Sequence, residues 1–140
     1  MAIQQGLTIS FKQDMLQAGQ NLLTDTLKIA LYTAFSDIGP NTTAYTTANE
    51  VAGDGYTAGG VVLTGTTIAA DENGVVYVDF ADASWPGANF VARGALIYNT
   101  TRSNKSVAVL DFGSDKTFSS TSNTIVMPAN TATTALIRFP

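Results

Sequence analysis

The sequence is dominated by short runs of strand-forming residues separated by turn residues, and this pattern limits the fold more than any other feature. In the first clear run, residues 27–32, alternation places Leu27, Ile29 and Leu31 on the buried side of a strand whose other side is solvated. Further runs cover residues 61–69, 75–80, 90–98, 106–112, 124–127 and 135–139. Runs of this length and spacing predict an all-β fold, a single antiparallel β-sandwich (or barrel) of about seven or eight strands.

Two of the connections carry hairpin signals. Asn73-Gly74 lies between two of the runs, and this dipeptide is typical of a tight turn between antiparallel strands. Residues 99–105 are polar and separate two longer runs in the same way. Both connections are therefore predicted to be hairpins.

One short helix is predicted near the N-terminus, over residues 10–19. Ser10 followed by Gln13 fits a capping box, Phe11 and Met15 share a face that packs over the end of a sheet, and Gly19 ends the helix. A helix this short is not stable alone. Residues 1–9 are predicted to form an N-terminal arm, with a short strand at residues 7–9.

Residues 42–60 are rich in Thr, Ala and Gly and carry no strong strand pattern. We predict a long ordered loop, with a short strand near Tyr45 or Val51. Long loops of this kind are often the functional surface of a small β domain. Because no boundary signal interrupts the chain, residues 1–140 are expected to form a single β domain.

Composition restricts the available chemistry. The chain contains no Cys and no His, which excludes disulfides, thiolate metal sites and the usual general base. Charged residues are only 13% of the chain, and the net charge is −4 with no basic stripe, so we expect no nucleic-acid partner. No apolar run reaches the ~20 residues that cross a bilayer, and no signal-peptide pattern is present, so no membrane partner is expected.

Two pairs of carboxylates were considered for paired-acid catalysis. Asp79 and Asp82 flank the end of one run, and Asp111 and Asp115 flank another turn. A glycosidase would hold two such groups about 5–10 Å apart across a cleft. The alternative, which we favour, is that aspartates at strand ends cap turns by hydrogen bonding to backbone amides. We therefore predict no catalytic residues and no enzyme activity.

Two turns offer oxygen atoms to a ligand. Residues 53–60 are glycine-rich, but they lack the ending of a phosphate-binding loop and precede a strand, so the glycines more simply permit tight turns. Residues 53–55 and 71–73 could offer oxygen ligands to calcium, although neither fits a twelve-residue EF-hand loop. The prediction is that there is no metal site and no cofactor.

Five apolar or aromatic residues are the candidates for contact with a partner. They are Ile3 and Leu7 in the arm, Tyr45 and Tyr56 in the glycine-rich stretch, and Trp85 between two runs. Exposed aromatic residues anchor protein and sugar partners, whereas buried ones are core residues. For Trp85, the sequence favours a core position over an interface position.

Five segments together resemble a pattern common to small proteins encoded by tailed bacteriophages. They are residues 26–33, 45–51, 55–60, 92–99 and 108–113. The resemblance covers most of the chain and implies a structural component of the virion. It brings no catalytic residues with it.

The resemblance and the composition lead to a functional expectation. The first hypothesis is a capsid decoration (cement) protein that binds and stabilises the outside of the major capsid lattice, with residues 1–10 and 42–60 contacting the shell. Few charges make close packing of identical chains easier, so a homo-oligomer is expected, with a trimer favoured. The alternatives are a tail, head–tail junction or fibre component, and a receptor- or carbohydrate-binding module on the particle. The expected partner is the major capsid protein or another virion protein.

Overall fold

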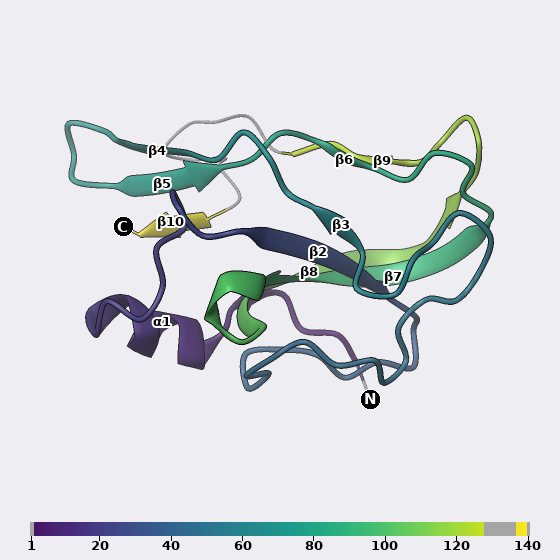
Figure 1. Cartoon of the computed structure of the whole chain (residues 1–140), viewed down its shortest axis with the longest axis horizontal. Helices are drawn as coiled ribbons and strands as arrows, with labels where there is room; N and C mark the ends of the chain where they lie inside the picture. Colours follow the sequence, from purple (N-terminus) through teal and green to yellow (C-terminus); the bar gives the residue numbers. More distant parts are fainter. Residues whose placement is uncertain (1, 128–136, 140) are drawn as a thin grey trace.

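The computed structural model describes residues 2–127 and 137–139, and these form antiparallel β-sheets with one short α-helix (Figure 1). The main sheet has the strand order β1 (Gly6–Leu7), β8 (Lys105–Phe118), β7 (Phe90–Asn99), β2 (Leu27–Tyr32) and β3 (Val61–Val62). A second layer holds a sheet of β10 (Ile137–Phe139), β5 (Val76–Asp79) and β4 (Thr67–Ala70), and a pair of β6 (Ala83–Ser84) and β9 (Thr124–Ile125). The predicted all-β fold with one short helix is confirmed, and the sheets do not close into a barrel.

The main core lies between the two layers. Leu27, Ile29 and Leu31 of β2 all point into it, as the alternation of the sequence predicts, and each is at most 1% exposed. From the second layer, Val78 and Phe80 pack against the same cluster. Burial of such side chains stabilises the fold by roughly 1.5–3 kcal/mol each.

The opposite face of the main sheet is also buried, so the prediction that β2 has one solvated side is wrong. Ala30 and Tyr32 are fully buried in a second cluster that includes Ile3 and Ile38. The chain between β2 and β3 covers this face (Figure 1). Alternation within β2 could not reveal this cover, because the covering residues come from a loop.

Helix α1 (Ile9–Leu16) begins earlier than predicted and ends earlier. Its N-cap is Thr8, whose Oγ1 accepts a 3.3 Å hydrogen bond from the backbone N–H of Phe11. Ser10 lies inside the helix and its hydroxyl bonds to that of Ser106, so the predicted capping box at Ser10 is wrong. The helix stops before Gly19, because the chain turns through Ala18 at a φ of 55°. Phe11 is fully buried, as expected for the sheet-facing side.

The residues before α1 are part of the main sheet. Gly6 and Leu7 pair with Val109 and Ala108 of β8, and the N–H of Gln4 donates a 3.0 Å bond to the carbonyl of Ile38. The prediction of an arm over residues 1–9 is thus corrected for its described part, residues 2–9. The short strand predicted at residues 7–9 is displaced to Gly6–Leu7, because Thr8 caps the helix.

Both predicted hairpins are present. Strands β4 and β5 pair across the turn of residues 71–75, where Gly74 has a φ of 87°. Strands β7 and β8 pair across a 3₁₀ helix, Thr100–Arg102. The run predicted at residues 61–69 is divided into β3 and β4, because Gly65 turns the chain at a φ of 67°.

The remaining differences concern strand lengths. Strand β8 continues six residues beyond its predicted end at Phe112, and β6 was not predicted. The run predicted at residues 124–127 shortens to Thr124–Ile125. Of the run predicted at residues 135–139, residues 135 and 136 lie outside the described residues, and β10 occupies the rest.

Candidate functional site

The loop of residues 42–60 crosses the face of the main sheet opposite the second layer (Figure 1). It is a long loop, as predicted, but the short strand predicted near Tyr45 or Val51 is wrong, because only isolated bridges occur there. Isolated bridges connect it to three places on the sheet: Ala44 with Lys105, Glu50 with Tyr32, and Asp54 with Asn89. The loop is therefore held to the sheet along its length.

Glu50 is the centre of a hydrogen-bond network that fixes this loop. Its Oε1 accepts a 2.7 Å bond from the hydroxyl of Tyr45. Its Oε2 accepts bonds from the hydroxyl of Tyr56, at 2.5 Å, and from the N–H of Gly59, at 2.8 Å. The Tyr56 hydroxyl also accepts a 2.9 Å bond from the N–H of Leu31 in β2. The carboxylate of Glu50 thus joins three points of the loop, and the hydroxyl of Tyr56 joins the loop to β2 of the main sheet.

Two further tyrosines attach the loop from the sheet side. The hydroxyl of Tyr98 donates a 2.6 Å bond to the carbonyl of Gly59, and the hydroxyl of Tyr32 donates a 2.6 Å bond to the carbonyl of Thr46. The rings of Tyr45 and Tyr98 stack with their centroids 4.7 Å apart and an interplanar angle of 18°. We call residues 42–60, fixed in this way, the clamped loop.

The environment keeps the tyrosines of the network protonated. Burial, followed by the hydrogen bond to Glu50 and its negative charge, raises the pKa of Tyr45 and Tyr56 far above the usual value. Burial and the charge of Glu50 raise the pKa of Tyr98 to about 12. At neutral pH these hydroxyls therefore remain donors. Chemically, the arrangement holds the loop in one conformation.

Two glycines allow the loop to approach the rest of the chain closely. At Gly60, with a φ of 80°, an added Cβ would lie 1.8 Å from the carbonyl oxygen of Ile29. At Gly55, with a φ of 82°, it would lie 2.5 Å from the carbonyl oxygen of Gly87. The glycine-rich stretch therefore serves backbone packing, as the sequence predicted in preference to a phosphate-binding loop.

The outer surface of the clamped loop is nearly uncharged. Glu50 and Asp54 are its only ionisable residues other than the tyrosines, and both oxygens of Glu50 accept hydrogen bonds within the chain. Its exposed residues are otherwise Thr, Ala, Asn and Gly. The loop therefore presents a fixed surface of small side chains with one carboxylate, that of Asp54.

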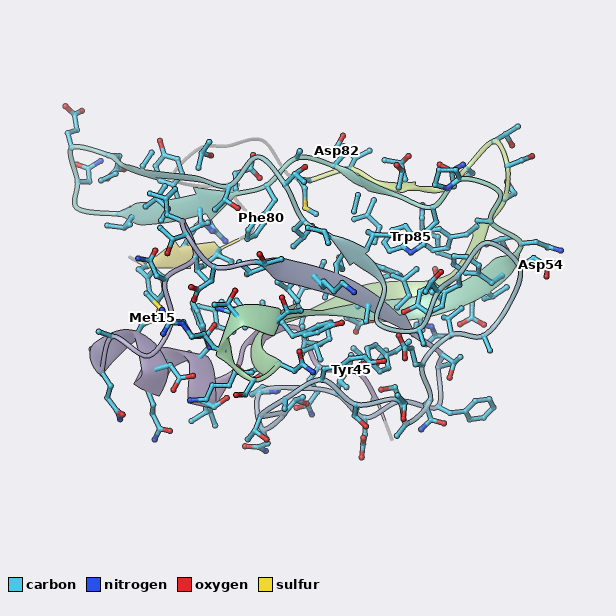
Figure 2. All side chains as sticks on the ribbon, viewed as in Figure 1. Met15, Tyr45, Asp54, Phe80, Asp82 and Trp85 are labelled. Atoms are coloured by element: carbon cyan, nitrogen blue, oxygen red, sulfur yellow. The ribbon has the colours of Figure 1, made fainter. Side chains whose placement is uncertain are left out.

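The five predicted contact residues lie in different parts of the molecule. Ile3 is 6% exposed and Trp85 is 1% exposed. Figure 2 shows Trp85 between the two layers and Tyr45 on the other side of the main sheet. Leu7 is half-buried against the main core, and Tyr45 and Tyr56 are half-buried in the clamped loop. Burial removes Ile3 and Trp85 from the set of surface anchors, and Trp85 takes the core alternative.

Sequence reasoning did not single out Glu50. A signal was present, because Glu50 lies between Tyr45 and Tyr56 in a stretch with only one other charge. A lone carboxylate among tyrosines and small residues is a natural hydrogen-bond acceptor. Its partners, however, come together only after the loop folds back on β2.

Three of the four aspartates that are candidates for paired-acid catalysis bind other groups of the chain. Asp82 accepts a 2.7 Å bond from the N–H of Met127, and Asp111 accepts a 2.9 Å bond from the N–H of Gly113. Asp115 forms a 2.9 Å ion pair with Arg93. The turn-capping interpretation is confirmed for Asp111, whereas Asp82 instead binds a backbone amide 45 residues away along the chain. Asp79 has one buried carboxylate oxygen without a partner among the described residues.

Of the two turns that could offer oxygen ligands to calcium, the one at residues 71–73 uses a carboxylate oxygen of Asp71 to accept bonds from the N–H groups of Asn73 and Val75. In the turn at residues 53–55, the backbone of Asp54 pairs with Asn89. Across residues 2–127 and 137–139, no three acidic, His or Cys side chains come together as a metal site would require. No helix in this part of the chain has the length and apolar character needed to cross a membrane.

The fold and the clamped loop define an all-β protein of sandwich-like architecture that carries a fixed, nearly uncharged surface on one side of its main sheet. No protein-family model, no curated protein and no solved structure matches the chain.

Proposed function

We propose that this chain is a structural protein that acts by binding other proteins, and specifically a virion component of a tailed bacteriophage. Within the virion, the proposed role is that of a capsid decoration protein, which binds the outside of the major capsid lattice and stabilises it. The observation that carries the proposal is the clamped loop, a surface of small uncharged residues held in one conformation by Glu50.

Two physical effects make such a surface suitable for binding protein. A loop that is already fixed loses little conformational freedom when a partner covers it. A surface with a single carboxylate, Asp54, also avoids most of the cost of removing charges from water. Both effects favour a protein–protein contact through the clamped loop that can be repeated in many copies.

Stabilisation of a capsid would then follow from mass action. A protein that binds the assembled lattice and not the free subunits shifts the equilibrium towards the lattice. Specific contacts bury about 1,000 Å² or more, so a domain of this size offers one or two such faces. The clamped loop is the face assigned to the capsid.

The location in the virion is tested by copy number. In purified particles, a decoration protein should approach the abundance of the major capsid protein, as measured by quantitative mass spectrometry. A much lower copy number would replace the capsid role with a tail, junction or fibre role. Absence from finished particles would overturn the virion proposal altogether.

The surface is tested by a matched pair of substitutions. Ala58→Arg places a large cation on the clamped loop, whereas Ala81→Arg places one between β5 and β6 in the second layer, and both alanines are exposed. We expect A58R to weaken binding to undecorated capsids at least ~10-fold, the effect of losing about 1.4 kcal/mol, and A81R to bind as the unchanged chain does. Equal binding by A58R and A81R would remove the clamped loop from the contact.

A further inference from the structure

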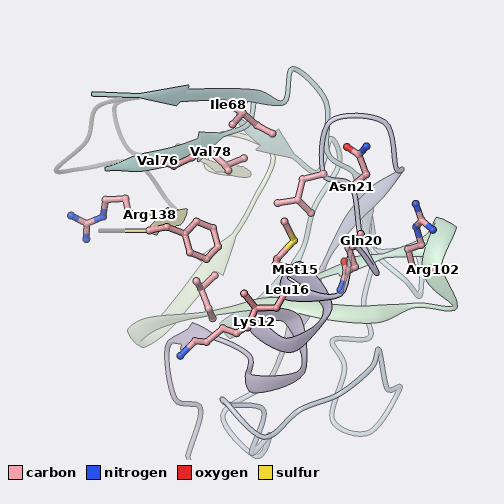
Figure 3. A pocket seen from close by; sticks show the side chains of 14 residues that line it. Lys12, Met15, Leu16, Gln20, Asn21, Ile68, Val76, Val78, Arg102 and Arg138 are labelled. Atoms are coloured by element: carbon pink, nitrogen blue, oxygen red, sulfur yellow. The ribbon is translucent and has the colours of Figure 1, made fainter. Parts of the chain in front are cut away.

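An open apolar groove of about 980 Å³ lies between helix α1 and the β4–β5 side of the second layer (Figure 3). Met15 and Leu16 of α1 form one wall, and Ile68, Val76 and Val78 form the other. The volume is at the upper end of the range of about 300–1,000 Å³ that is common for binding pockets. The groove is therefore large enough to receive several side chains of a partner.

The apolar residues of the groove are unusually exposed. Leu16 is 90% exposed, and Ile68, Val76 and Met15 are 46%, 38% and 37% exposed. Single exposed apolar residues are ordinary, but a contiguous group of them marks a contact surface. The group spans two walls of one groove, so a single occupant could cover all four.

The lining of the groove is basic, whereas the chain as a whole is acidic. It includes Lys12, Arg102 and Arg138 and none of the eleven acidic residues, although Arg102 is already ion-paired with Asp25 at 2.8 Å. The chain as a whole has a net charge of −4. In Figure 3, Arg138 and Arg102 lie towards opposite ends of the groove. The complementary occupant is an apolar side chain accompanied by a carboxylate.

The chain itself presents such a segment directly after β2. Phe35 is 74% exposed, and the exposed Asp37 follows two residues later. The turn that carries them is fixed: Ser36 and Ile38 are buried, and the carbonyl of Phe35 accepts a 3.2 Å bond from the side chain of Asn49. A protruding aromatic ring on a fixed turn is typical of a residue that dominates an interface.

The groove and Phe35 lie at opposite ends of β2, so they cannot meet within one chain. Leu22, which lines the groove, precedes the first residue of β2, and Phe35 follows its last residue, Tyr32. A strand of six residues spans about 20 Å. A second copy is needed to bring the two surfaces together.

We propose that the groove receives Phe35 of a second copy of this chain, with Asp37 facing the cations of the groove. The contact is head-to-tail, so it uses a different surface on each copy and cannot form a symmetric two-fold dimer; it builds a ring when the rotation between successive copies closes. This deepens the proposed function and rests on it, because the ring would be the unit that decorates the capsid.

The proposal is tested by the molar mass of the full chain in solution, measured by light scattering over a range of concentrations. We expect an oligomer that dissociates on dilution. Phe35→Ser removes the inserted side chain, and Leu16→Ser removes an apolar wall. Each should weaken association about 30-fold or more, as for a dominant interface residue. Val126→Ser is the matched control, since Val126 is 73% exposed and lies outside both surfaces.

Mixing the two variants distinguishes this contact from others. F35S keeps its groove and L16S keeps its phenylalanine, so a mixture should form a 1:1 complex and grow no further. A monomeric unchanged chain at all concentrations, or an oligomer that F35S and L16S leave intact, would overturn the proposal. Copy number in virions is a separate measurement, so a failure of the ring is distinguishable from a failure of the virion role. Circular dichroism verifies that each variant is folded.

Discussion

The hydroxyl of Tyr45 donates a 2.7 Å hydrogen bond to Oε1 of Glu50, and the two residues lie in the same loop, five positions apart. The second oxygen of Glu50 accepts from Tyr56, whose hydroxyl reaches β2. This one carboxylate therefore connects a loop of 19 residues, 42–60, to the sheet beneath it.

Replacing Glu50 with glutamine should destabilise the protein. The neutral amide offers one acceptor oxygen in place of two, so at least one hydroxyl or amide donor loses its partner. Hydrogen bonds to charged groups contribute roughly 1.5–3 kcal/mol each, and we expect E50Q to lower the free energy of unfolding by about that amount. Urea denaturation measures it.

The control for this substitution is the only other glutamate of the chain. Glu72 is exposed in the β4–β5 turn. Surface substitutions away from specific contacts usually change stability by less than about 0.5 kcal/mol, so E72Q should be nearly neutral. Equal urea midpoints for E50Q and E72Q would argue against the clamp.

Gly60 should not tolerate a side chain. Gly60 and Gly74 have similar φ values, 80° and 87°, but an added Cβ meets the Ile29 carbonyl oxygen at 1.8 Å only at Gly60, and nothing within 4 Å at Gly74. The strain of a positive φ costs about 1–2 kcal/mol in both G60A and G74A. We therefore expect G60A to lower the melting temperature more than G74A does, because only at Gly60 does the added Cβ meet another part of the backbone. Similar melting temperatures for the two variants would contradict the close approach at Gly60.

The hydrogen-bond network around Glu50 predicts that its tyrosines ionise, and the protein unfolds, only at a pH well above that at which free tyrosine ionises. An unfolded tyrosine ionises near pH 10, whereas the pKa of Tyr98 is raised to about 12 and those of Tyr32, Tyr45 and Tyr56 are raised further. The folded state favours the neutral hydroxyls, so this contribution to stability is complete below pH 10 and is lost as the pH rises towards 12 and beyond. Absorbance at 295 nm should show these tyrosines ionising together with unfolding. Ionisation of these four tyrosines near pH 10 in the folded protein would contradict it.

The lowered pKa of Asp25 predicts a contribution to stability that is lost at acidic pH. Burial by itself would raise the pKa of Asp25, but the hydrogen bond from Arg102 Nε, at 2.8 Å, opposes it. Further bonds from the Asn21 N–H and the Asn99 side chain bring the pKa from 3.8 to about 2. The stabilisation is therefore complete above about pH 4 and is lost as the pH falls through 2.

Asp25→Asn should remove this dependence. Relative to the unchanged chain, D25N should be roughly 1–3 kcal/mol less stable at pH 7, and the difference should shrink below pH 4. Thermal melts between pH 7 and pH 2 measure it, with Asp54→Asn as the exposed control. A difference that stays constant over this range would show that the charge of Asp25 is not responsible.

The parts of the fold that were predictable rest on local patterns. Alternation in β2 indicated which face of the strand enters the core, and Asn73-Gly74 indicated the turn between β4 and β5. The start of α1 was missed because Thr8 and Ser10 are both good capping residues. Thr8 takes that role because β1, held by β8, delivers the chain to the helix there.

The candidate site was predictable only in outline. The length and composition of residues 42–60 predicted a long loop, which the structure confirms, and its role in binding stays a prediction. The common partner of Tyr45 and Tyr56 was not foreseeable, because the three points that Glu50 joins lie at Tyr45, Tyr56 and Gly59 and meet only on the folded loop. Ile3 and Trp85 were named as contact candidates, but burial depends on the whole chain and places both in the core.

The sequence by itself determined the class of the fold, the two hairpins and the inventory of side-chain chemistry, since these depend on residue types and on spacings of a few positions. The tertiary structure alone decided that the second face of β2 is also covered, what Glu50 binds, and that Phe35 and the groove lie at opposite ends of a strand. The physical reason is that burial and hydrogen-bond partners are set by contacts between residues far apart in the chain, which no local pattern encodes.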